Sequence, residues 1–285
     1  MSSLVVSGSD PKEIAELLTT ELNSCRQWLI DNKLSLHLGK TESILFGSNK
    51  KLRKANNFEV RCNNVVIEQV KSVKYLGLQL DANLGGTSIV NEILKKANSK
   101  LKFLYKFKDM LNFKSRKTLC TALIQCHFDY ACSSWYPGAS KTLKKKLQIM
   151  QNKTTRFILD LSSRTSIRNK ELVKTGCLNV SDRVKQLKLG HVHKIKNKTS
   201  PKYMTEHFLL LSDIKNRPVT RATATDFFTP SVCNTNTFYF SGIRDWNALP
   251  PKVKEITNYI AFKEKLKQTL MAEAKKADED QFQYN

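Results

Sequence analysis

The spacing of apolar residues changes at Gly85-Gly86, and this change limits the folds open to the chain. Before it, residues 11–32 have the apolar spacing of one long helix. Short strand-like runs follow at 34–36, 44–46, 58–62, 65–67 and 73–80. After the two glycines the spacing is helical, starting with residues 89–105. The sequence therefore predicts an α+β protein, in which short antiparallel strands and one helix precede a mainly helical region.

The starts of two helices can be predicted from capping residues. Asp10 before Pro11 favours a helix start, because aspartate caps free N–H groups and proline suits the first helical position. Glu13 could reach back to complete a capping box. Ser115 is the expected cap of the second helix after the glycines. We predict this and the later helices at 118–128, 143–158, 167–174, 181–196, 202–210 and 260–275.

These patterns divide the chain into four parts. Residues 1–84 contain the mixed helix and strands, and residues 87–215 contain the basic helices. Residues 216–276 form a C-terminal region with an extended Thr/Phe-rich segment at 218–240 and a final helix. The polar residues 277–285 are expected to form a flexible, frayed tail.

Positive charge is concentrated in the middle of the chain. The 285 residues have a formal net charge of +23, and residues 91–217 alone carry 28 Lys/Arg against eight Asp/Glu. Such a density repels itself unless a polyanion offsets it, and phosphate backbones do so through counterion release. The alternative is a lysine-rich surface solvated by water. The expected nucleic-acid contacts are Lys95, Lys96, Lys100, Lys144, Lys145, Lys146, Lys153 and Arg156.

Aromatic residues interleave with lysines over residues 102–108. In one interpretation these rings stack on bases beside a track of phosphates. In the other, the helix buries Leu104 and Tyr105 and presents its lysines to solvent. The sequence leaves both open.

Several classes of protein are not favoured. The chain has no apolar run of about 18 residues, so no membrane partner is expected. The first ten residues lack the basic patch and apolar core of a signal peptide. Seven scattered cysteines indicate a reducing compartment, so we expect an intracellular protein, with cytoplasm or nucleus left open.

Signatures of hydrolases and metal sites are also missing from the sequence. No Gly-x-Ser-x-Gly motif or phosphate-binding glycine loop occurs, so no small-molecule substrate is expected. Cys120, Cys126, His127 and Cys132 lie within thirteen residues, but they lack the Cys-x-x-Cys spacing of a zinc site. We predict buried structural cysteines there.

Several short motifs occur along the chain in an order that can be compared with known protein families. Trp28 at a helix end is followed by Leu34-Ser35-Leu36, then Lys40-Thr41, then Tyr75-Leu76-Gly77. This order resembles the part of a non-LTR retrotransposon reverse transcriptase that follows its paired-aspartate hairpin. Later motifs resemble the thumb and C-terminal region of the jockey-like members: they lie at 119–123, 128–130, 147–153, 193–203, 240–250 and 262–266.

The resemblance assigns roles to parts of the chain. Residues 1–84 would be a partial palm, from just after the catalytic hairpin through the primer grip, and residues 87–215 the thumb and connector. Lys40 would be the palm lysine that protonates the leaving pyrophosphate, or else a lysine of a surface turn. The primer grip would be Tyr75, Leu76 and Gly77, and a buried Tyr-Leu pair in a hairpin explains the same residues.

The resemblance also raises doubts about catalysis. Nucleotidyl transfer needs two divalent metals held by clustered carboxylates, and the intact family uses Mg²⁺. The chain has no Asp-Asp pair, and its early aspartates, Asp10, Asp31 and Asp81, lie in turn or capping contexts. By the resemblance, the catalytic aspartates would precede Met1. We therefore expect no cofactor and no polymerase activity from this chain, and whether it is an enzyme stays uncertain.

Three interpretations of function remain. The first is a truncated, catalytically dead relative of reverse transcriptase that still binds RNA or an RNA–DNA hybrid. The second is a fragment of a longer, active RNA-directed DNA polymerase. The third is a helical interaction protein without a nucleic-acid role.

Overall fold

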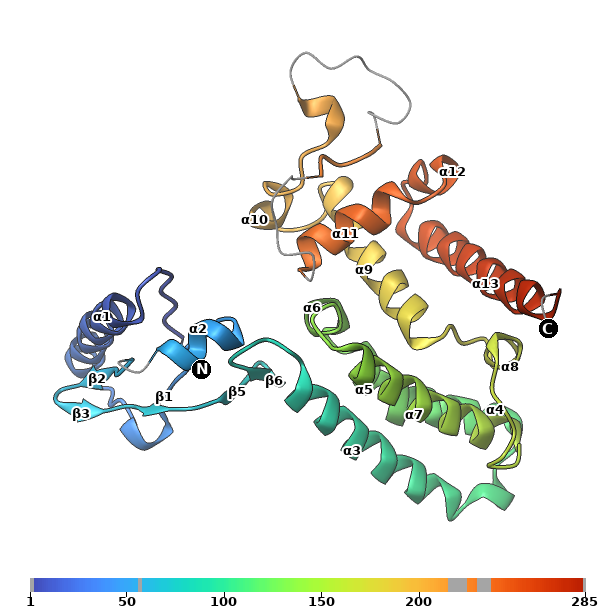
Figure 1. Cartoon of the computed structure of the whole chain (residues 1–285), viewed down its shortest axis with the longest axis horizontal. Coiled ribbons are helices and arrows are strands. Elements are labelled where there is room, and N and C mark those ends of the chain that lie inside the picture. The colour runs from blue at the N-terminus through green and yellow to red at the C-terminus, as the bar shows by residue number, and fades with distance from the viewer. Residues whose placement is uncertain (1–2, 56–57, 215–224, 230–236, 284–285) are drawn as a thin grey trace. The chain divides into compact units, whose positions relative to one another are not determined.

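The structure is a computed structural model that describes residues 3–55, 58–214, 225–229 and 237–283. The chain divides into two compact units, an N-terminal unit (Met1–Ile89) and a C-terminal unit (Val90–Asn285) (Figure 1). Short strands occur in the first and helices dominate the second, so the predicted α+β class is confirmed. The finer division into four parts stays a prediction.

The N-terminal unit begins with helix α1 (Pro11–Asp31), close to the predicted 11–32. As predicted, Asp10 caps it: the Asp10 carboxylate accepts a hydrogen bond from the backbone N–H of Lys12 at 3.0 Å. One face of α1 covers a small core. The buried residues of this core are Ile14, Ala15, Phe58, Val60, Cys62 and Ile67.

Three short two-stranded ladders make up the rest of the unit. Strand β2 (Arg61–Cys62) pairs with β3 (Val65–Val66), and β5 (Ser72–Tyr75) pairs with β6 (Leu78–Asp81), both antiparallel as predicted. Strand β1 (Glu42–Ser43) pairs with β4 (Glu68–Gln69) in parallel, so the prediction of antiparallel strands alone is wrong. The connection between β1 and β4 is long enough to return the chain in the same direction.

Two predicted strands are absent where they were expected. Residues 34–36 form no ladder and lead into a short 3₁₀ helix, η1 (Leu38–Lys40). The run at 44–46 follows β1 without pairing, because only Glu42 and Ser43 are in register with β4. The expected turn at 50–57 begins with helix α2 (Asn49–Lys54), which Ser48 caps by accepting the N–H of Lys51.

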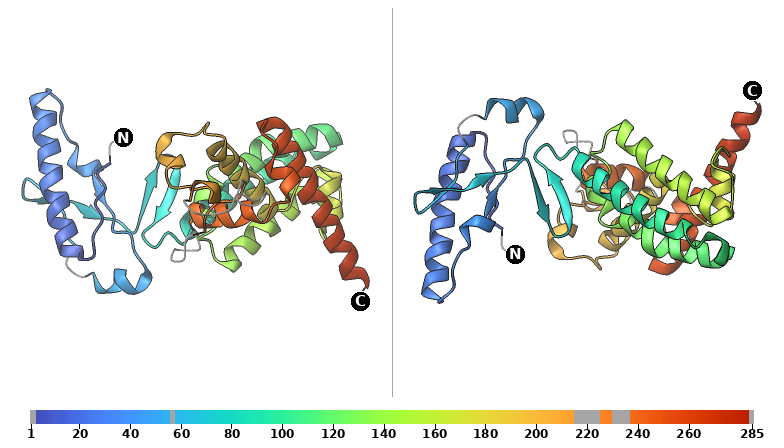
Figure 2. Two further views of the ribbon diagram at one scale, coloured as in Figure 1. Left: turned by 90° about the horizontal axis from the view of Figure 1, so that it is seen from above. Right: turned by 90° about the horizontal axis from the view of Figure 1, so that it is seen from below.

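The C-terminal unit is helical. Its longer helices are α3 (Thr87–Tyr105, which begins just before the unit), α4 (Phe113–Cys120), α7 (Lys141–Leu159), α9 (Val180–Lys196), α11 (Phe238–Asn247) and α13 (Tyr259–Gln283). The shorter ones are η2 (Lys108–Met110), α5 (Cys126–Asp129), α6 (Cys132–Trp135), α8 (Asn169–Lys174), α10 (Lys202–Thr205), η4 (Leu211–Asp213) and α12 (Pro251–Lys254). Helices α4 and α7 pack together, with α3 alongside them (teal to green in Figures 1 and 2), and α9 packs on α11 and α13 (yellow to red).

The second predicted helix differs in its start and its shape. Asn112, and not Ser115, is its cap: the Asn112 side chain accepts the backbone N–H of Ser115 at 2.9 Å. The helix runs through α4, a π-helical turn η3 (Thr121–Gln125) and α5 without a break. It is half-buried, with Cys120, Ile124 and Phe128 on its inner side.

Aromatic residues build the core between α9, α11 and α13. Trp246 of α11 is fully buried and donates its indole N–H to the Thr225 carbonyl at 2.8 Å. Asn247 holds the neighbouring segment by accepting the N–H of Phe227 and donating to its carbonyl, at 2.9 and 2.8 Å. Phe262 of α13 is also fully buried. The motif residues of 240–250 and 262–266 thus supply this core.

Predictions near the C-terminus need two corrections. The predicted extended segment at 218–240 lies partly outside the described residues, and its described end, 238–240, is the first turn of α11 under a Thr237 cap. The final helix does not end at 275 but continues through Gln283. Asp278 explains this extension, because its carboxylate accepts hydrogen bonds from Asn169 and from the Lys170 N–H of α8, both at 3.0 Å.

His193 is buried in the same core. Its ring stacks on Phe262 with centroids 4.3 Å apart, and its Nε2 lies 2.8 Å from the Ile256 carbonyl. Burial lowers the pKa of His193 below its usual 6.5; the Ile256 contact acts against this shift, and the charge of Lys196 adds to it. The folded protein therefore favours the neutral imidazole.

We expect acid to destabilise the C-terminal unit through His193. The pKa of His193 is lower in the folded chain than in the unfolded chain, so the unfolded state binds the proton more readily. Stability is fully present above about pH 6.5 and is lost as the pH falls below it. Urea unfolding at about pH 7.5, 6.5 and 5.5 measures how the free energy of unfolding changes with pH on both sides of the usual histidine pKa. This change in unfolding free energy with pH should be smaller in His193→Gln. An equal change in the variant and the wild type would contradict the role given to His193.

Candidate nucleic-acid interface

Helix α7 separates apolar and basic residues onto two sides. Ser140 caps it by accepting the N–H of Leu143. The buried side contains Leu143, Leu147, Met150, Phe157 and Ile158. The sequence of α7 contains six Lys/Arg and no Asp/Glu. We call its exposed lysines the α7 lysine face: Lys141, Lys145, Lys146 and Lys153.

Lys144 and Arg156, two of the predicted contacts on α7, are engaged within the protein. The Lys144 ammonium lies 3.3 Å from the Pro137 carbonyl and 4.9 Å from the centre of the Tyr136 ring. Burial, and to a smaller extent the charge of Lys188, lowers the pKa of Lys144. Arg156 donates its Nε–H to the Thr165 carbonyl at 2.7 Å. These two side chains anchor loops, and we leave them out of the proposed interface.

Helix α3 carries a second set of exposed lysines. Lys95, Lys96 and Lys100 are all exposed, as expected for contacts, although Lys96 pairs with Glu92 at 2.6 Å. Lys102 and Lys106 are exposed as well. Residues seven positions apart lie on one side of a helix, so Lys95 and Lys102 share a side of α3, and Lys106 follows directly after its last residue, Tyr105. We call these three residues the α3 lysine face. The seven-residue spacing from Lys95 to Lys102 and the four-residue spacing from Lys102 to Lys106 could have identified the last two from the sequence.

The C-terminal ends of α3 and α7 are fastened together. Tyr105 and Phe157 pack in an edge-to-face arrangement, with ring centroids 4.9 Å apart. Asp160, at the end of α7, pairs with Lys108 and with Arg116, the latter at 3.4 Å. The hydrogen bond from Lys108 is the main cause that lowers the pKa of Asp160. The basic helices therefore belong to one packed group.

The potential beside α3 is positive. His127 of α5 has a pKa below its usual 6.5, first because of burial and then because of the charges of Lys96 and Lys100. Glu92 opposes this effect only in part. Protonating His127 is therefore harder than protonating an unperturbed imidazole, and an anion beside Lys96 and Lys100 would relieve the part of that penalty that their charges cause.

The residues assigned to a palm lie in the N-terminal unit. Lys40 is exposed at the end of η1. Leu76 and Gly77 have positive φ angles of 45° and 82°, which form the tight turn between β5 and β6. Tyr75 and Leu76 are exposed, so the interpretation as a buried Tyr-Leu pair is wrong. The primer-grip role and the role of Lys40 stay predictions.

The cysteine cluster behaves mainly as structural packing. Cys120 and Cys132 are buried as predicted, whereas Cys126 is exposed. Burial raises the pKa of Cys120 to about 12 and that of Cys132 to about 11, so both thiols are protonated at neutral pH. Among the described residues, no group of three or more His, Cys, Asp or Glu could hold a metal ion.

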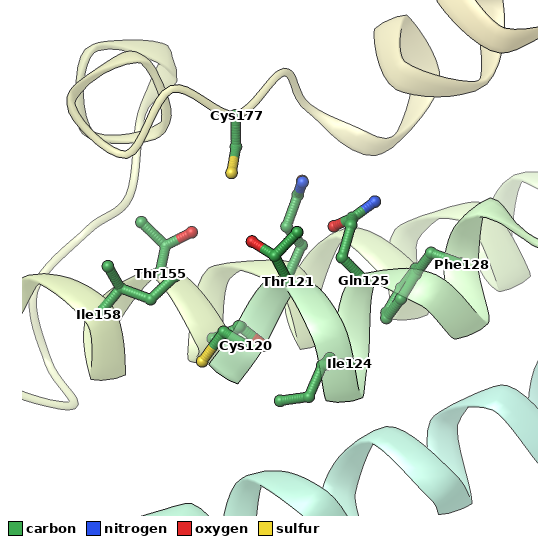
Figure 3. Close-up of a pocket in the computed structure, with 10 residues that line it drawn as sticks. Cys120, Thr121, Ile124, Gln125, Phe128, Thr155, Ile158 and Cys177 are labelled. Carbon is green, nitrogen blue, oxygen red and sulfur yellow. The ribbon is translucent and has the colours of Figure 1, made fainter. Parts of the chain in front are cut away.

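A small pocket opens beside the π-helical turn η3. Figure 3 shows that Cys120, Thr121, Gln125 and Cys177 are among the residues that line it. The empty space is about 350 Å³ and includes open solvent, so its enclosed part is small for a ligand site. Its lining residues include no carboxylate and no histidine. The pocket offers no set of groups for acid–base or metal chemistry.

Within the described part of the chain, no helix is both long and apolar enough to cross a membrane. In comparisons with known proteins, no family model, no curated protein and no solved structure matches the chain. The lysine faces of α3 and α7 are therefore the strongest candidate site.

Proposed function

We propose that the chain is a relative of the reverse transcriptases of non-LTR retrotransposons and that it binds RNA or an RNA–DNA hybrid through the lysine faces of α3 and α7. The observation that carries the binding proposal is the composition of α7. Its exposed side bears four lysines with no acidic residue on the helix, and its packing depends on the opposite side. Those lysines are free to neutralise phosphates and release their counterions.

The proposed origin is supported by the order of motifs in the sequence. Several of these motif residues have packing roles: Trp246 and Phe262 belong to the core around α11, and His193 is buried with them. Asn247 is half-buried and holds Phe227 by two hydrogen bonds. A protein that kept this core would keep these motifs without keeping catalysis. Nucleotidyl transfer is left out of the proposal for this chain, because the Asp-Asp pair is missing from its sequence.

A second candidate function is docking to a protein partner. The N-terminal unit buries few apolar side chains and exposes many large ones. Those on and around α1 are Val5, Leu17, Trp28, Ile30 and Leu34. Exposed apolar surface of this kind marks interaction sites. If the lysine faces bind no nucleic acid, this candidate takes precedence.

We expect RNA binding by the purified protein to weaken steeply with salt. About 0.7 to 0.9 counterions are released per neutralised phosphate, so six contacts give a slope of about −4 to −5 in a plot of log K against log salt. Fluorescence anisotropy with labelled oligonucleotides of two unrelated sequences measures the slope. The two sequences should bind alike. A slope near zero, or no binding at about 50 mM salt, would refute the binding proposal.

A further inference from the structure

The connection between α3 and α4 exposes apolar side chains among lysines. Phe103 and Phe107 are 53% and 42% exposed, Met110 is 85% exposed, and Phe113 is exposed as well. These residues lie within 103–113, which we call the α3–α4 tip. Exposed aromatic side chains gathered in so short a segment usually serve recognition.

Phe103, in the last turn of α3, and Phe107, just after the helix, form a pair of rings. Their ring centroids lie 5.2 Å apart with an angle of 59° between the planes. In this tilted arrangement the rings support each other, and each keeps a large part of its surface in solvent. Tyr105 lies between them and is 46% exposed, so only Leu104 of the Leu104–Tyr105 pair is buried as the second interpretation of this segment expects. The Tyr105 ring also packs against Phe157, which the other two rings do not.

The charges around the pair favour an anionic ligand. Lys102 and Lys106 precede the two phenylalanines and are exposed, and both belong to the α3 lysine face. Lys108 is held by Asp160, which fixes the base of the tip. Asp109 is the acidic residue within the tip. Lysines that alternate with exposed rings suit a ligand that offers phosphates and flat apolar faces together.

We propose that Phe103 and Phe107 stack on unpaired bases of single-stranded nucleic acid while Lys102 and Lys106 contact its phosphates. The inference rests on the proposed function and narrows its ligand. Bases in a duplex already stack on their neighbours, so the rings add nothing to the binding of a hybrid. Unpaired bases have free faces, and aromatic side chains bind these with little sequence preference.

The test compares two double variants on three oligonucleotides of equal length. Phe103→Leu/Phe107→Leu keeps apolar bulk but removes the rings, and Phe103→Tyr/Phe107→Tyr keeps the rings. The ligands are a single strand, the matching duplex, and an abasic strand with the same phosphates. The leucine variant should lose about tenfold or more in affinity for the single strand alone. The tyrosine variant should bind within about twofold of the wild type, as should Ile260→Ala, which alters a 68% exposed apolar residue of α13.

The outcomes separate base stacking from plain charge attraction and from binding to a membrane surface. If the leucine variant lost affinity equally for the abasic strand or for the duplex, the base-stacking proposal would be overturned. An unchanged affinity of the leucine variant for the single strand would also overturn it. In that case, steep salt dependence of RNA binding by the wild type would still support the proposed function. If the leucine variant lost the binding of the wild type to phosphatidylserine vesicles but kept its binding to all oligonucleotides, the α3–α4 tip would be assigned to a membrane surface. Absence of any nucleic-acid binding by the wild type would remove both proposals.

A direct signal of stacking comes from Phe107→Trp. A base stacked on the introduced indole should quench its fluorescence when the single strand is added, and the abasic strand should not. The wild-type tryptophans, Trp28, Trp135 and Trp246, lie outside the tip and provide the background. Quenching that is equal with both strands would count against stacking.

Discussion

Replacing Asp226 with alanine should lower the unfolding free energy of the C-terminal unit by about 3–5 kcal/mol. The Asp226 carboxylate lies 2.7 Å from the ammonium of Lys254, whose side chain is only 4% exposed. That ammonium also donates to the Asn247 carbonyl at 2.7 Å. Without Asp226 the buried positive charge loses its counter-ion, and no water replaces it cheaply. Urea unfolding followed by tryptophan fluorescence measures the loss.

Two controls define the cause of that loss. Asp213→Ala removes an exposed carboxylate and should change the stability by less than about 0.5 kcal/mol. Adding Lys254→Met to Asp226→Ala removes the stranded charge and should recover much of the loss, because a buried ion pair and an apolar pair can be of similar stability. A double variant as unstable as the sum of the two single variants would show that the ion pair is not the cause.

Reversing the charge of Lys95, Lys145, Lys146 and Lys153 together should weaken RNA binding by about three orders of magnitude at 0.1 M salt. Four phosphate contacts are lost, so the salt slope should become shallower by about three. The loss should be the same for every sequence, since phosphate contacts do not read bases. Anisotropy titrations over a range of salt concentrations measure both effects.

The matched control reverses four exposed lysines of α13: Lys263, Lys265, Lys275 and Lys276. It changes the net charge by the same amount, but on a helix whose lysines are mixed with acidic residues. We expect it to retain most of the affinity. If both quadruple variants lose affinity equally, the chain attracts RNA through its overall charge and has no defined interface. Reversing the lysines of α3 and of α7 separately then measures the share of each face.

The sequence predicted α1, α3, α7 and α9 to within about two residues at either end, because their signals are local. Helix α1 follows from Asp10 and its apolar spacing, and α7 from its alternation of apolar and basic residues. The start of α11 was missed, because Phe238-Tyr239-Phe240 favours a strand by propensity. The Thr237 cap and burial against α9 override that preference. The parallel pairing of β1 with β4 depends on residues far apart in the chain, which local patterns do not reveal.

The candidate site was predicted in part for a similar reason. Net charge along the chain identified α3 and α7, and helical spacing separates exposed lysines from apolar positions. The roles of Lys144 and Arg156 depend on the carbonyls of Pro137 and Thr165, which only the folded chain brings close. Charge alone cannot tell a lysine that anchors a loop from one that faces solvent.

The hydrogen bonds between α8 and Asp278 bear on how the protein forms during synthesis. In the first turn of α8, Glu171 accepts the Arg168 N–H locally, whereas the Lys170 N–H donates to Asp278, a residue 108 positions later in the chain. Domains fold as the chain leaves the ribosome, but contacts of such long separation must wait for the later residue. The contacts that fasten α3 to α7, made by Tyr105 and Asp160, join residues that precede α8, so that group of helices can pack first. The helix group around α13 closes last, and a stalled or shortened nascent chain would leave α8 incomplete beside an already packed pair of basic helices.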